Sequence, residues 1–160
     1  MIDKQHQEDL LYDEDVSHVA TRAELLPTWF KICLTVLIFT HFRELWGIGR
    51  VYLNTDFIET ESMGNAIVKV VFAAYFLISG LTIVISLLYR VQWKHAVSLG
   101  IPIFSTSLLL NAVSLVGYFI GDMQRLVNAG TSIVNVLVLT VVIVNSFRIR
   151  KRWAEAVVVK

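Results

Sequence analysis

The sequence has one cysteine, two prolines and no catalytic motif among its 160 residues. A lone Cys33 excludes an internal disulfide and a thiolate metal cluster. There is no glycine-rich phosphate loop, no zinc-type spacing of His and Glu, and no nucleophile elbow. His41 and His95 are expected on opposite sides of a bilayer, so they cannot share a haem. We therefore expect no cofactor, no bound metal and no enzymatic activity.

Charge is missing from three long apolar stretches, Val70–Tyr89, Ala96–Gly121 and Leu126–Phe147. A hydrocarbon core about 30 Å thick takes roughly 20 helical residues, and a helix pairs every backbone polar group within its own segment. The chain is 56% hydrophobic, and its mean hydropathy of +0.64 leaves little material for a soluble domain. These features predict an all-α integral membrane protein.

A fourth, weaker span is expected between Thr28 and Ile48. Lys31 can extend to the nearer interface, and Trp29 and Trp46 bracket the segment as interfacial anchors do. The sequence thus predicts a four-helix transmembrane bundle. Its domain covers residues 27–148, with spans at about 28–48, 66–89, 96–120 and 126–147.

Lysine and arginine are unevenly distributed between the two sides of this bundle. Arg90 and Lys94 lie in one loop, and Arg148, Arg150, Lys151 and Arg152 follow the last span on the same side. The positive-inside rule then places both termini in the cytoplasm, with the bundle in the cytoplasmic (inner) membrane. The termini are a short acidic arm, residues 1–26, and a basic tail, residues 149–160. The acidic arm does not reverse the orientation, because Asp and Glu contribute little to the rule.

The second and fourth spans end in a similar way, with aromatic and basic residues: Tyr89, Arg90 and Trp93 in one, Phe147, Arg148 and Trp153 in the other. A parallel two-plus-two duplication would explain this similarity. A shared need for an interfacial collar explains it equally, and we favour the collar.

Small polar side chains recur at helical spacing within three spans. Residues of this kind usually face neighbouring helices, where they form hydrogen bonds. We therefore favour a packing role, with a polar path for a small solute or a proton as the alternative. The predicted lining consists of Tyr75, Ser79, Thr82, Ser107, Asn111, Ser114, Asn128, Ser132 and Asn135.

Charged groups inside spans are rarer and carry more information. We place a candidate ionisable cluster near the outer face, and within it we expect Glu44 and Lys69 to match in depth and form an ion pair. A salt-bridged interfacial anchor is the favoured role, and a substrate or proton site at the mouth of the bundle is the alternative. The cluster comprises His41, Arg43, Glu44 and Lys69.

The function inferred from the sequence is that of a non-enzymatic accessory or structural subunit of a membrane assembly. The expected partners are membrane lipids and either other membrane protein subunits or further copies of this chain. The alternative is a small transporter or channel that works as a homo-oligomer. Nucleic acid is not an expected partner, because the basic tail is short and topology already explains it.

Overall fold

The computed structural model describes residues 21–54, 63–120 and 126–156, and they form four helices. These are α2 (Thr28–Asn54), α3 (Met63–Arg90), α4 (Ala96–Ile120) and α5 (Leu126–Glu155). Three of them contain segments that are long and apolar enough to cross a membrane: Lys69–Arg90, Ala96–Val116 and Ala129–Glu155. The predictions of an all-helical chain and of these three membrane helices are confirmed.

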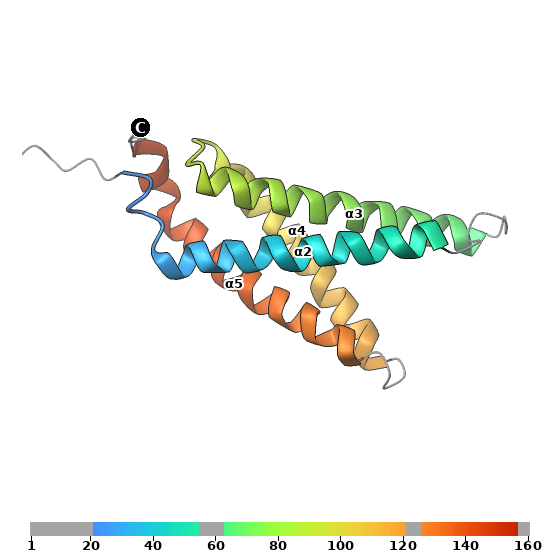
Figure 1. Ribbon diagram of the computed structural model, residues 1–160. Coiled ribbons are helices and arrows are strands. Elements are labelled where there is room, and N and C mark those ends of the chain that lie inside the picture. The colour runs from blue at the N-terminus through green and yellow to red at the C-terminus, as the bar shows by residue number, and fades with distance from the viewer. Residues whose placement is uncertain (1–20, 55–62, 121–125, 157–160) are drawn as a thin grey trace, which may run out of the picture.

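The helices form two antiparallel hairpins that cross each other. In Figure 1, α2 lies along α3, and α4 lies along α5, with further packing between α3 and α4 and between α2 and α5. The hairpins converge at the end that holds the C-terminal turns of α5 and diverge towards the opposite end. We call the converging end, made of residues 21–30, 85–104 and 146–156, the closed end.

Two helices extend beyond the spans predicted from hydropathy. α2 starts after Pro27, as expected, but continues to Asn54 rather than stopping at residue 48. α5 continues through the basic residues to Glu155, so the predicted tail begins as a helix. Hydropathy marks where a bilayer would end, whereas a helix ends where its own backbone hydrogen bonds end. Arg and Lys are good helix formers and do not stop it.

α3 ends in a tight turn that directs the chain back into α4. The backbone N–H of Trp93 donates to the carbonyl of Leu88, and that of Gln92 donates to the carbonyl of Tyr89. This pair of bonds is the Schellman arrangement, which needs a left-handed residue just after the helix. Gln92 takes that position with φ of 58°.

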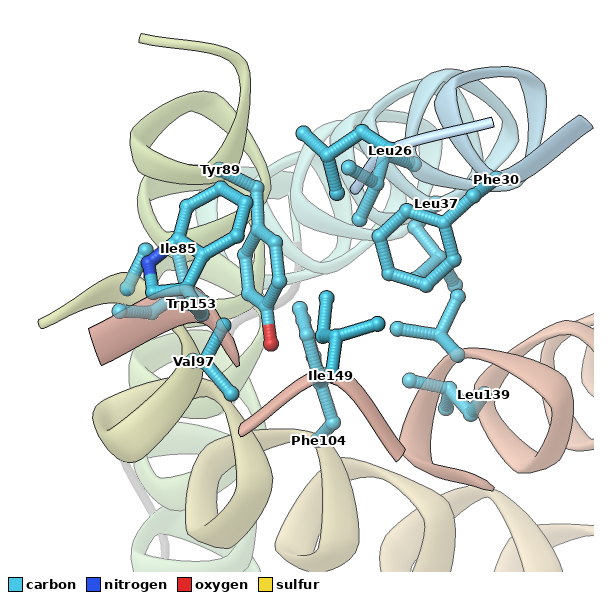
Figure 2. Close-up of a cluster of buried hydrophobic side chains, with 13 residues drawn as sticks. Leu26, Phe30, Leu37, Ile85, Tyr89, Val97, Phe104, Leu139, Ile149 and Trp153 are labelled. Carbon is cyan, nitrogen blue, oxygen red and sulfur yellow. The ribbon is translucent and has the colours of Figure 1, made fainter. Parts of the chain in front are cut away.

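An aromatic cluster fills the closed end. The Tyr89 ring lies with its centroid 5.7 Å from those of Phe30 and Trp153, and 5.9 Å from that of Phe104. Figure 2 shows Tyr89 within the cluster, with Trp153 on one side and Phe30 on the other. The Tyr89 hydroxyl is 2.7 Å from Ser146 Oγ, so its polar end is also paired. Each of the four helices thus contributes an aromatic or hydroxyl group to one core.

Arg22, in the segment before α2, ties the closed end together. It is buried, and its guanidinium donates to the carbonyls of Trp153 at 3.2 Å and Gln92 at 3.0 Å. The Trp153 indole N–H in turn donates to the carbonyl of Trp93 at 3.1 Å. The end of the predicted acidic arm therefore packs on the helices, and residues 22 and 153 lie at the same end of the molecule.

Candidate functional site

Glu44 lies where the two hairpins cross. It belongs to α2, and its carboxylate receives hydrogen bonds from both neighbouring helices. Asn135 Nδ2 of α5 donates to Oε1 at 2.6 Å, and Ser79 Oγ of α3 donates to Oε2 at 3.4 Å. The bond from Asn135 is the shorter of the two. Glu44 therefore connects the first hairpin to the second.

A chain of polar groups continues from Glu44 into α4. Asn135 Nδ2 also donates to Asn111 Oδ1 at 3.2 Å, and Asn111 Nδ2 donates to the backbone carbonyl of Ser107 at 2.9 Å. Ser107 Oγ is 2.9 Å from His41 Nε2, back on α2. Residues from all four helices thus form one network, which we call the crossing network: His41, Glu44, Ser79, Ser107, Asn111 and Asn135.

His41 is fully buried in this network, and its partners define its tautomer. Nδ1 is 2.9 Å from the carbonyl of Leu37, which can only accept, so Nδ1 carries a proton. In the neutral ring, Nε2 then accepts from the Ser107 hydroxyl. His41 and Glu44 are three residues apart and share one face of α2.

The network lies deeper than the sequence suggested. Eleven residues separate Ser79 from Arg90 on α3, a rise of about 16 Å, and thirteen separate Asn135 from Arg148 on α5, a rise of about 20 Å. Half of a 30 Å hydrocarbon core is about 15 Å. Ser79 and Asn135 thus lie near the middle of the candidate spans, and so does Glu44, which bonds to both. α2 continues ten residues past Glu44. The contacts of Glu44 with Ser79 and Asn135 do not agree with the predicted position near one face.

The predicted ion pair between Glu44 and Lys69 is also wrong. Glu44 meets α3 at Ser79, ten residues from Lys69, which corresponds to about 15 Å along the helix. The Lys69 side chain is exposed. Arg43, the other cation of the predicted cluster, points to α5, where it donates to Thr131 Oγ1 at 3.0 Å. The sequence placed Glu44 at the wrong depth because it ended α2 too early.

The other predicted lining residues are not members of the crossing network. Thr82 is buried but donates to a carbonyl of its own helix, that of Ile78. Ser132 is buried, and Tyr75 and Ser114 are half-buried. The side chain of Asn128 lies outside the described residues. The network therefore draws on a subset of each stripe.

Sequence reasoning missed several residues at the closed end. Ser146, which meets the Tyr89 hydroxyl, lies on the same face of α5 as Asn135, about three turns beyond the polar residues that we selected. Arg22 looked like one of the few cations of an acidic arm. The only available signal was its position five residues before Pro27, at the start of the first apolar segment.

The chemistry available at the crossing is that of one acid and one imidazole among neutral amides and hydroxyls. Within residues 21–54, 63–120 and 126–156, no three His, Cys, Asp or Glu side chains gather as a metal site would require. Comparison of the chain with protein-family models, curated proteins and solved structures found no match.

Proposed function

We propose that this chain is a four-span membrane protein that acts as a non-enzymatic accessory or structural subunit of an assembly in the cytoplasmic membrane. One observation carries the proposal: the polar residues at the crossing bond to one another. His41, Asn111 and Asn135 are at most 1% exposed. Groups arranged in this way hold helices together and do not line a water-filled path.

The diverging ends of the hairpins supply the surface for such an assembly. Trp46 of α2, Val70 of α3, and Val113 and Val116 of α4 are each more than half exposed there. Figure 1 shows that the two hairpins are apart at these ends. Lipid covers them in an isolated copy, and helices of other membrane subunits or further copies cover them in the assembly.

The topology proposed with this function has both termini in the cytoplasm. Residues 22 and 153 lie at one end, so three crossings by α3, α4 and α5 require a fourth by α2. That end also holds Arg90, Lys94 and the basic residues of α5, which the positive-inside rule assigns to the cytoplasm.

Cysteine labelling in intact cells tests the topology. On a Cys33→Ser background, a cysteine at Asn54 is expected to react with an impermeant thiol reagent, and one at Gln92 is not. The reverse pattern would overturn the orientation, and reaction of both would overturn the crossing of α3, which separates the two positions.

Cross-linking tests the assembly. On the same background, a cysteine at Val113 is expected to form cross-links to another subunit or another copy, while one at Lys94, exposed at the closed end, serves as the control. Purification in mild detergent should recover the same partner. Equal cross-linking at both positions, or a monomer recovered alone, would contradict the proposal.

Transport of a small solute or proton is the second candidate, and the depth of Glu44 favours it. Proton relays and coupled transporters place ionisable residues within the membrane, facing the bundle interior. Flux into proteoliposomes above that of empty vesicles, abolished by Glu44→Gln, would replace the subunit proposal with this one.

A further inference from the structure

Glu44 is the only carboxylate in the apolar part of the four described helices, and its two hydrogen bonds are directed to different hairpins. Ser79 donates from the first hairpin and Asn135 from the second. Neither the subunit proposal nor the packing role of the stripes requires an acid at this position, because an amide would form interhelical bonds as well. An ionisable group therefore needs its own explanation.

Asn135 supplies the second observation. Its side chain is fully buried, and its Nδ2 is used twice, towards Glu44 and towards Asn111. Its Oδ1 is buried with no hydrogen-bond partner. Buried amide oxygens nearly always have a donor, so this acceptor calls for one. A turn of the amide about its terminal torsion exchanges the places of Nδ2 and Oδ1.

We propose that Glu44 is a proton-binding site in which Asn135 serves both protonation states. In the ionised state, Asn135 Nδ2 donates to the carboxylate, as the structure shows. When a proton from water bonds to Oε1, the acid loses its negative charge, and its O–H donates to Asn135 Oδ1. No other covalent bond is made or broken in the uptake, and the hydrogen bonds from Asn135 Nδ2 to Glu44 and to Asn111 are given up when the amide turns.

The surrounding groups favour a proton over a metal cation. A bound metal cation requires several oxygen ligands at once, whereas the hydrogen bonds of Glu44 in this structure come from Ser79 Oγ and Asn135 Nδ2 alone. One carboxylate also balances only one positive charge.

Few other charged or titratable groups face Glu44. From α2 these are Arg43, the next residue, and His41, one turn away. From α3 the nearest is Tyr75, one turn from Ser79. The described side chains of α4 and the part of α5 that packs here offer amides and hydroxyls.

Proton uptake at this position changes how the hairpins are joined. The ionised carboxylate accepts hydrogen bonds from both hairpins at once. The protonated acid instead donates a hydrogen bond to Asn135 of α5. Asn135 also bonds Asn111, so a turn of its amide alters the contact with α4. The crossing of the hairpins is thereby linked to pH, and the link does not depend on which of the two proposed functions holds.

Infrared difference spectroscopy of the full-length protein in lipid vesicles tests the site. Acidification should produce C=O bands of protonated carboxyl groups, and one of these bands should be missing in Glu44→Gln but present in Glu155→Gln. Glu155 is the matched control, because it is an exposed carboxylate at the end of α5. A band of unchanged intensity in Glu44→Gln would overturn the proposal, as would its absence from the wild-type protein.

A second variant separates a proton site from a merely buried acid and does not depend on the folding of Glu44→Gln. Asn135→Leu removes the acceptor of the acid O–H, so the band should shift in frequency and its pH midpoint should move. Ser79→Ala should shift the midpoint less, because its bond to Glu44 is the longer one. An unshifted band in Asn135→Leu would refute the role of Asn135. Displacement of the band by Na⁺ but not by choline would identify a metal-cation site instead.

Discussion

At the closed end, the four helices meet through aromatic and aliphatic side chains, whereas two to three turns further along they meet through a carboxylate, an imidazole, amides and hydroxyls. The first region is buried, and in the second Asn111 and Asn135 are buried while Glu44 is half-buried. Tyr89, Phe104 and Trp153 fill the first, and Glu44, Asn111 and Asn135 fill the second. The first is held by close packing, which has a single good arrangement. The second is held by hydrogen bonds whose donors and acceptors can exchange.

The difference indicates how the molecule divides its tasks. The closed end also receives Arg22, whose bonds to two backbone carbonyls fix the segment before α2. It therefore sets the position of all four helices. We therefore expect the crossing network to tolerate a change of bonding partner without loss of the fold, since packing at the closed end also positions the helices.

The largest expected effect is that of Trp153→Ala. Trp153 is 1% exposed, and its loss leaves a cavity beside Tyr89 and removes the indole bond to Trp93. We expect the free energy of unfolding to fall by about 3 to 5 kcal/mol. Reversible unfolding in mixed detergent micelles measures this, with Trp46→Ala as control. Trp46 is 66% exposed, and its replacement should change stability by less than about 0.5 kcal/mol. Equal losses in the free energy of unfolding would mean that packing at the closed end contributes no more to stability than an exposed side chain does.

Gly100→Ala should have the next largest effect. A Cβ at Gly100 would lie 2.7 Å from Tyr89 Cε2 and 3.0 Å from the Tyr89 hydroxyl oxygen. Such overpacking destabilises by about 1 to 3 kcal/mol.

Gly80→Ala is the matched control for Gly100→Ala, because nothing lies within 4 Å of its added Cβ. It should be neutral or should stabilise α3 by up to about 1 kcal/mol, as Ala does in a helix interior. The same unfolding assay compares the two. If both variants are equally stable, the close approach of Gly100 to Tyr89 is refuted.

Replacing an amide at the crossing should cost less than opening the closed end. Asn111→Leu and Asn135→Leu each remove interhelical hydrogen bonds worth about 0.6 to 2 kcal/mol in a membrane. Because Asn135 Nδ2 bonds Asn111 Oδ1, the two losses should not add in the double variant. Additive losses would contradict the bond between Asn135 and Asn111, and a single loss as large as that of Trp153→Ala would contradict the closed end as the region that positions the helices.

The sequence predicted the three most apolar helices well because continuous apolar stretches leave no other structure in lipid. It failed where helix and membrane boundaries differ. Residues 49–54 contain Gly49 and Arg50 and resemble a loop, yet α2 continues through them. With the longer α2, Glu44 lies opposite Ser79, near the centre of the α2–α3 pair, and not opposite Lys69.

The candidate site was predicted in its residues but not in its partners. Glu44, Asn111 and Asn135 were all identified, since polar groups are rare and costly in apolar spans. Which of them meet depends on how the hairpins cross, and helical spacing defines faces but not the register between helices. The role of Tyr89 was missed for the same reason: it was read as part of an interfacial collar, and it is the centre of a core.

The smallest predicted effect on stability is that of Gln92→Gly, in the turn between α3 and α4 at the closed end. Gln92 adopts φ of 58°, a left-handed conformation that costs a residue with a Cβ about 1 to 2 kcal/mol. Gln92→Gly removes that strain, and it also removes Oε1, which is buried with no hydrogen-bond partner. Glycine gives back about 0.4 to 1 kcal/mol through the larger entropy of the unfolded chain. The net result should be stabilisation by about 0.5 to 1 kcal/mol in the unfolding assay. Gln92→Ala keeps the left-handed strain and is the control, so a gain as large in that variant would assign the effect to the lost amide and not to the backbone.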